Sequence, residues 1–188
     1  VESALSRSIN RSVAAHPEWR QAPPAVSEVL QLIAKDVSVT AEEQVAERAA
    51  AAWLAAWPGG DLDAKDEAGW SALQRAAEAG QAVAVKELLR RPGVEVNGVE
   101  PTKGQPALVL ASRGGHEAVV RVLLACAKVE VNLAQAGGAT ALYIAAQEGH
   151  EAVVELLLAH AAVDPNPAMQ DGYTPLLIAA ERSHEAVV

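Results

Sequence analysis

Residues 138–166 read GATALYIAAQEGHEAVVELLLAHAAVDPN, and the same pattern recurs along the chain. Each copy starts with a glycine, and these glycines are Gly69, Gly104, Gly138 and Gly172. The steps between them are 35, 34 and 34 residues, and in each complete copy an Asn follows the glycine 28 residues later. Chance does not hold such a register over three copies, so the sequence predicts a tandem-repeat protein.

The first half of each copy predicts a short helix. In the last copy Thr174 stands at the N-cap, where its hydroxyl can accept a hydrogen bond from a backbone N–H. Pro175 follows at the first helical position, which suits its fixed φ. Leu176, Ala179 and Ala180 then form an apolar face with helical spacing. Thr140 occupies the same N-cap position one copy earlier.

The second half of each copy predicts another helix and an extended loop. Left-handed glycines are expected to end the first helix, at Gly80, Gly115 and Gly149. A second helix then follows, for example over residues 151–160. Its expected buried stripe consists of Val153, Val154, Leu157 and Leu158. A Val-x-Val-Asn segment leads from this helix into a polar turn.

Neither helix reaches the roughly 12–15 residues that an isolated helix needs in water. The helix pairs must therefore bury their apolar faces against one another, which predicts a solenoid. Composition agrees, because the 188 residues include 41 alanines and no Phe. Thin side chains of high helix propensity favour packed helices over a β-sandwich.

The pattern resembles the ankyrin repeat over residues 64–188. The matching elements are Thr-Pro-Leu followed by Ala, then Gly-His, Val-Val, Leu-Leu and Val-Asn. The resemblance implies an all-α fold, an ankyrin-repeat solenoid of helix-turn-helix units with extended loop fingers. We expect an N-terminal helical cap to precede it.

Some positions depart from the family pattern. The His of the Thr-Pro-Leu-His motif is replaced in every copy, by Gln74, Val109, Tyr143 and Leu177. Pro106 replaces the capping Thr of the second copy, and Tyr143 is expected to act as a spacer between units. The period exceeds the usual 33 by one, and we place the extra residue in the loop after the second helix. These changes call the usual cap hydrogen bonds into question but not the fold.

The chain divides into six predicted segments. They are an N-terminal helical segment (1–39), a degenerate half-repeat or cap (40–63), three ankyrin repeats (64–98, 99–133 and 134–167) and a partial repeat (168–188). Helices are predicted over residues 3–15, 25–35 and 40–57, the last with Thr40 and Glu43 as a capping box. Trp53 and Trp57 lie one turn apart, and they either seal the first full repeat or form an exposed anchor for a partner.

The last copy stops within its second helix, at Val188. Val187 and Val188 would be core positions, whereas a terminal repeat normally has a polar outer face. We therefore expect more repeats or another domain to follow.

No residue cluster predicts catalysis. His116, His150 and His184 recur once per copy, but stacked helix pairs place them roughly 8–10 Å apart, too far to share a metal ion. Cys126 is the single cysteine and has no neighbouring base, so we expect a structural thiol and not a nucleophile. The sequence thus predicts no enzyme, no cofactor and no metal site.

Charge and hydropathy limit the possible partners and cellular locations of the protein. The formal net charge is −9 with scattered Lys and Arg, so a nucleic-acid partner is not expected. No apolar stretch approaches the roughly 20 residues of a membrane span. One cysteine argues against a disulfide-rich secreted scaffold. We expect an intracellular, cytoplasmic protein, and an organelle after removal of a targeting peptide stays open.

The resemblance implies that finger tips and the ends of the first helices recognise a partner on a concave face. Carried over by alignment, the candidate partner-binding residues are Glu67, Trp70, Glu78, Lys103, Gln105, Arg113, Gln147, Glu148, Asp171, Tyr173, Glu181 and Arg182. Smaller or polar residues beside them on the finger tips are Ala68, Thr102, Ala136, Gly137, Ala139 and Gln170. Trp70 and Tyr173 stand out, since Trp and Tyr are enriched among binding hot spots. Packing of Trp70 against the neighbouring finger is the alternative.

The sequence therefore predicts a non-catalytic protein–protein interaction scaffold. Two alternatives stay open. The chain could be a targeting or regulatory module of an enzyme that lies outside it, or a permanent structural subunit of a large assembly.

Overall fold

The computed structural model describes residues 44–52, 54–55, 57, 64–167, 169 and 172–188. The chain divides into two compact units, Val1–Ala49 and Ala50–Val188, and the repeats lie in the second. Residues 44–52 and 54–55 are helical. The helices predicted over 3–15 and 25–35 lie outside the described residues, as do Thr40 and Glu43 of the predicted capping box.

Helices of seven or eight residues alternate along the second unit. They are α3 (Ala72–Glu78), α4 (Ala82–Leu89), α5 (Ala107–Arg113), α6 (Glu117–Leu124), α7 (Ala141–Glu148), α8 (Glu151–Leu158) and α9 (Pro175–Glu181). Each spans about two turns, so tertiary packing and not helix length must stabilise it.

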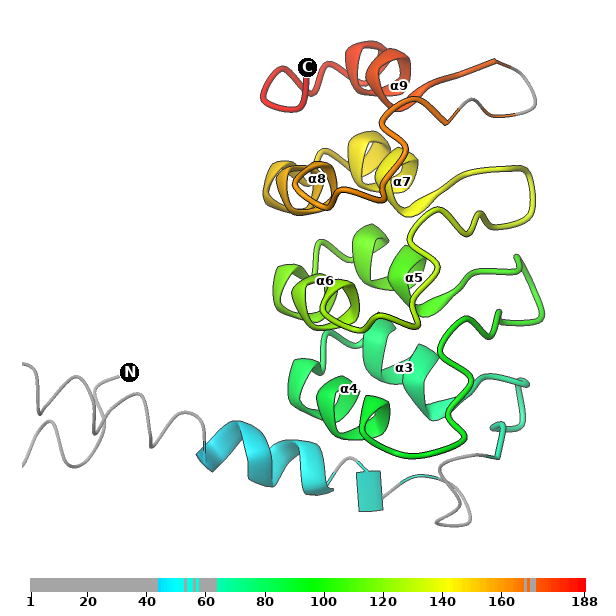
Figure 1. Cartoon of the computed structure of the whole chain (residues 1–188), viewed down its shortest axis with the longest axis vertical. Helices are drawn as coiled ribbons and strands as arrows, with labels where there is room; N and C mark the ends of the chain where they lie inside the picture. Colours follow the sequence, from blue (N-terminus) through cyan, green and yellow to red (C-terminus); the bar gives the residue numbers. More distant parts are fainter. Residues whose placement is uncertain (1–43, 53, 56, 58–63, 168, 170–171) are drawn as a thin grey trace, which may run out of the picture. The chain divides into compact units, whose positions relative to one another are not determined.

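The helices stack in two columns. The first helices α3, α5, α7 and α9 pack in sequence on one another, and α4, α6 and α8 form the second column (Figure 1). The loops between repeats project as fingers beyond the first column (Figure 1). In the described residues the only β pairings are the isolated bridges Lys65–Ser71 and Val99–Pro106. The predicted all-α solenoid is confirmed.

Two first helices begin at the predicted caps. Thr140 Oγ1 accepts a hydrogen bond from the backbone N–H of Tyr143 at 3.3 Å, and Thr174 Oγ1 accepts one from Leu177 at 3.3 Å. Pro175 is the first residue of α9. These hydroxyls satisfy backbone donors that have no partner within the helix.

The other two first helices begin differently. Ser71 Oγ accepts from the backbone N–H of Gln74 at 3.3 Å, and Gln74 Oε1 accepts from the N–H of Ser71 at 2.9 Å. This is a capping box, and it uses the Gln that replaces the family's His. Pro106, at the N-cap of α5, makes no side-chain cap.

The predicted left-handed glycines are confirmed, and a second feature of the structure also requires glycine at these positions. Gly80, Gly115 and Gly149 have φ of 69°, 65° and 76°. A Cβ at Gly115 would also lie 2.8 Å from the ring of His150, and the other two glycines face a histidine in the same way. Glycine is therefore required both by the backbone and by the next repeat.

Those histidines tie neighbouring repeats together. In each, ring Nε2 lies 2.9 Å from the carbonyl oxygen of a residue in the preceding first helix, as a donor in the Nε2–H tautomer. The pairs are His116 with Glu78, His150 with Arg113, and His184 with Gln147. The sequence pattern by itself predicts only that these residues start the second helix.

The Asn of each Val-x-Val-Asn segment forms a second tie. Asn97 Oδ1 accepts from the backbone N–H of Glu130, and its Nδ2 donates to the carbonyl of Lys128, both at 2.9 Å. Asn132 makes the same two bonds to the following repeat, at 2.9 and 2.7 Å. The repeats are thus joined by hydrogen bonds along the loops as well as by the core.

The core runs along the stack between the two columns. Leu88, Leu123 and Leu157 from the second helices are at most 1% exposed. Trp57 is also buried, at 7%, which contradicts the exposed-anchor alternative for this residue and fits the sealing one. Trp53 lies outside the described residues. None of the described helices is long and apolar enough to span a bilayer.

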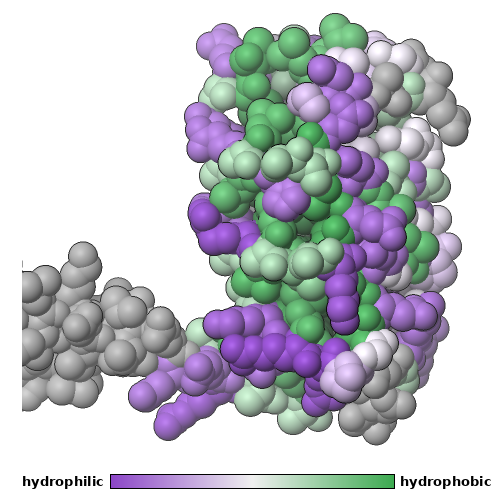
Figure 2. All heavy atoms as spheres, viewed as in Figure 1, coloured by the Kyte–Doolittle hydropathy of each residue, from purple (hydrophilic) through white to green (hydrophobic). Residues whose placement is uncertain are grey.

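The predicted buried set is wrong at the end of the third repeat and in the fourth. Leu158, Leu176 and Val188 are 52%, 56% and 65% exposed, and Ala180 is exposed too. The second helix of the fourth repeat is not formed, since residues 185–187 make only turns after His184. Figure 2 shows the resulting apolar surface at this end of the stack. The helix expected over 151–160 also ends earlier, at Leu158.

Candidate partner-binding face

Four fingers close in the same way. In each, a backbone N–H donates to a carbonyl across the tip, from Asp66 to Trp70, Glu100 to Gln105, Gln135 to Ala139 and Met169 to Tyr173, at 2.8–3.1 Å. The second finger spans one residue more than the others, which explains the single 35-residue step of the sequence. We call the surface formed by these fingers and the first helices the finger face.

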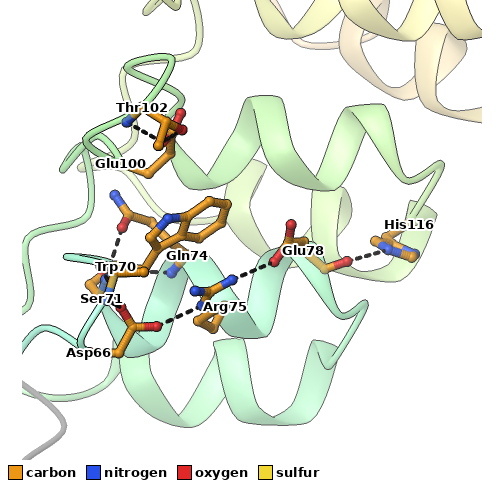
Figure 3. Close-up of polar contacts among 10 residues, drawn as sticks. Asp66, Trp70, Ser71, Gln74, Arg75, Glu78, Glu100, Thr102 and His116 are labelled. Carbon is orange, nitrogen blue, oxygen red and sulfur yellow. Dashed lines mark hydrogen bonds and ion pairs between the residues drawn. The ribbon is translucent and has the colours of Figure 1, made fainter.

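Trp70 on the first finger is held in a polar cluster. The Asp66 carboxylate accepts from the N–H of Trp70 at 2.8 Å, and its other oxygen accepts from Arg75 Nε at 2.8 Å. The Arg75 guanidinium lies 4.2 Å from the Trp70 ring centroid and also bonds to Glu78 at 3.2 Å. Figure 3 shows this chain of contacts along α3. The two carboxylates orient the Arg75 guanidinium, and its cation–π contact in turn holds the Trp70 ring in place.

The same cluster sets the charge of Asp66. Partial burial would raise the pKa of this carboxyl, but the N–H of Trp70 and the guanidinium of Arg75 outweigh it, so the pKa lies below its ordinary value. The first finger therefore keeps its carboxylate ionised.

The second finger is organised around a buried carboxylate. Glu100 is 1% exposed and accepts from the backbone N–H groups of Thr102, Lys103 and Gln105, at 2.6, 2.7 and 3.2 Å. The Thr102 hydroxyl donates to it as well (Figure 3). Burial would raise the pKa of Glu100, but the bonds from Thr102, Lys103 and Gln105 outweigh it and lower the pKa.

The second and third fingers are joined side by side. The backbone N–H of Ala136 donates to the carbonyl of Lys103 at 2.9 Å. Gln105 donates its amide to Gln135 Oε1, and Arg113 donates to the same oxygen at 3.3 Å. These bonds hold the two fingers and the end of α5 in one arrangement.

The predicted partner-binding residues differ in exposure. The exposed ones are Glu67, Glu78, Lys103, Glu148, Tyr173, Glu181 and Arg182. Trp70, Arg113 and Gln147 are half-buried, and Gln147 donates to Glu148 at 3.0 Å. Asp171, like Gln170, lies outside the described residues.

Two residues predicted at exposed tips are buried instead. Gln105 and Ala139 are each 1% exposed. Both directly follow the finger glycine in a middle repeat, and Gln105 donates its amide to Gln135 of the adjacent finger. Gln105 therefore supports the finger face and does not present itself to a partner.

Sequence reasoning missed Asp66, Arg75, Glu100 and Gln135. A signal existed for Arg75, because the other repeats carry Leu110, Ile144 and Ile178 at its position, all buried. For Glu100 the signal was the length of its finger, which has one residue more than the others. Asp66, Arg75 and Glu100 bond within their own repeat, whereas Gln135 bonds to Gln105 and Arg113 of the preceding repeat, which periodicity does not predict.

Histidines and the cysteine form no cluster in the part of the chain that the structure describes. No group of three or more His, Cys, Asp or Glu there has metal-binding geometry. Cys126 is half-buried and not in a disulfide.

Comparison with known families matches the fold. A model of ankyrin repeats in three copies matches residues 43–135 and 127–188, which together span most of the chain. A search among curated proteins finds no match. With stacked helix pairs, fingers and this match in agreement, the chain belongs to the ankyrin-repeat family.

Proposed function

We propose that this chain is a non-catalytic scaffold whose finger face, the concave face of the family, binds another protein. Ankyrin repeats generally mediate protein–protein interaction and are typically non-enzymatic. The net charge of −9 argues against a nucleic-acid partner, and the single cysteine fits an intracellular setting.

The observation that carries this proposal is the fixed Trp70. Its backbone is bonded to Asp66, and its ring is stacked on Arg75. Trp and Arg are the residues most often found as hot spots, and a side chain that is already ordered loses little entropy on binding. The exposed carboxylates of Glu67 and Glu78 flank it as a polar rim.

The test is affinity capture from an extract of the source organism, with the full chain immobilised. Trp70→Ala should reduce recovery of the partner at least ten-fold, as expected for a hot spot. The matched control is Lys86→Ala, an exposed residue of α4 in the same repeat but off the finger face. Equal capture by Trp70→Ala, with an unchanged melting profile, would contradict the proposal.

A permanent structural subunit is distinguished by the stability of the complex. A partner that stays bound through dilution and high salt would favour that role over a reversible scaffold.

A further inference from the structure

One position at the C-terminal end of each first helix belongs to the finger face in every repeat. Its occupants are Glu78, Arg113, Gln147 and Glu181. From the first repeat to the fourth, this column reads acidic, basic, neutral and acidic. Arg113 is its one cation.

Arg113 differs from Arg75 in what neutralises it. Arg75 bonds to two carboxylates, those of Asp66 at 2.8 Å and Glu78 at 3.2 Å. Arg113 donates to the amide oxygen of Gln135 at 3.3 Å, and over residues 64–167 no carboxylate pairs with it. An amide orients a guanidinium without cancelling its charge.

The surroundings of Arg113 hold it in place. Gln135 Oε1 also accepts from Gln105, which is buried, so the amide that orients Arg113 is itself fixed. The carbonyl of Arg113 is the one bonded by His150 of the next repeat, at 2.9 Å. The side chain is half-buried, so a charge pair formed there is screened less than one in open solvent.

Resting on the proposed function, we propose that Arg113 is the anchor for one carboxylate side chain of the protein partner. The planar guanidinium matches a carboxylate with two parallel hydrogen bonds. The site is preorganised, positive and lacks an internal carboxylate, which is what such a partner group requires.

The flanking repeats limit the partner to an isolated acidic residue. Glu78 and Glu148 are exposed carboxylates on the repeats directly before and after that of Arg113, and Glu181 is another one repeat further. Successive first helices lie about 8–10 Å apart, a distance that three residues of an extended chain cover at about 3.3 Å each. Neutral or basic residues should therefore occupy the positions three away from the acidic one.

The experiment uses a phage-displayed library of random 12-residue peptides, selected on the full wild-type chain. The best peptide is then synthesised, and its affinity is measured by fluorescence anisotropy. Selected sequences should carry one Asp or Glu in a neutral or basic context, and replacing that residue by Asn or Gln should weaken binding about ten-fold or more. A deca-glutamate peptide should bind less tightly than the selected one.

Protein variants locate the effect. Arg113→Met should weaken binding of the selected peptide about ten-fold or more, and Arg113→Lys should recover part of the lost affinity. The matched control is Arg121→Met, the same change on α6 of the same repeat, which removes only an exposed pair with Glu117 and should leave binding unchanged.

The outcomes separate this inference from the proposed function. Peptides that lack an acidic residue, or that bind Arg113→Met as tightly as wild type while Trp70→Ala weakens them, overturn the role of Arg113 alone. Peptides whose affinity is unchanged by Arg113→Met and by Trp70→Ala overturn both proposals. A folded wild-type chain that enriches no peptide, or that prefers deca-glutamate, also overturns the inference.

Discussion

At the scale of single residues, one buried position carries a polar side chain where the other repeats have an apolar one. Ser112 in α5 is fully buried, and its hydroxyl has no hydrogen-bond partner among the described residues. The other repeats carry alanine there, at Ala77, Ala146 and Ala180. A buried hydroxyl without a partner loses its hydration and gains nothing in return.

Ser112→Ala should therefore stabilise the protein. It removes the unpaired hydroxyl and introduces the best helix former, for a gain of about 1 kcal/mol in the free energy of unfolding. Urea unfolding followed by circular dichroism measures it. Ser71→Ala is the matched control with the opposite sign, because it removes the capping box of α3 and should cost about 1 kcal/mol. A loss of stability in Ser112→Ala would contradict this account of the site.

At the scale of the structural element, the second finger depends on a charge. Four donors converge on the buried carboxylate of Glu100, and the finger it organises bonds to the third finger through Lys103 and Gln105. Pro106 leaves α5 without a side-chain cap, and Glu100 accepts from the backbone N–H of Gln105 directly before it.

The Glu100 contribution should depend on pH. The pKa of Glu100 is lowered from its ordinary 4.5 in the folded state, so the unfolded chain binds more protons near that pH. Its stabilisation is complete above pH 4.5 and is lost as pH falls through the folded pKa. Glu100→Gln should cost roughly 1.5–3 kcal/mol at pH 7. The difference in the free energy of unfolding between wild type and Glu100→Gln should then narrow below pH 4.5. A difference that stays constant down to pH 3 in urea titrations would contradict this role of the Glu100 carboxylate.

At the scale of the whole repeat array, contacts between repeats make the stack. The histidine rings lie over the left-handed glycines of the preceding repeat, and the asparagines bond across the loops. A solenoid's stability is the sum of its repeats and their interfaces, so these ties decide whether it unfolds as one cooperative unit.

Gly115→Ala tests that coupling. It should destabilise through two effects, the strain of alanine at φ 65° and the clash with the His150 ring at 2.8 Å. Gly137→Ala is the matched control, because Gly137 has φ 95° but nothing within 4 Å of an added Cβ. We expect the free energy of unfolding to fall by about 1 kcal/mol in the control and by clearly more in Gly115→Ala. In a His150→Ala background the excess should disappear, as a double-mutant cycle in urea would show.

The sequence by itself determined the repeat register, the helix pairs, the threonine caps and the left-handed glycines, because each follows from local periodicity or from the backbone of one residue. Tertiary structure alone decided which predicted residues face outward. Gln105 and Ala139 are buried, Gln105 with a bond to Gln135 of the third finger, whereas Leu176 is 56% exposed. It also decided what surrounds each arginine. Arg75 pairs with Asp66 and Glu78 of its own repeat, whereas Arg113 donates to the amide oxygen of Gln135 in the next repeat. Sequence periodicity predicts the elements because it reflects contacts within one repeat, whereas the burial of Gln105 and the bonds of Arg113 depend on the side chains of the next repeat.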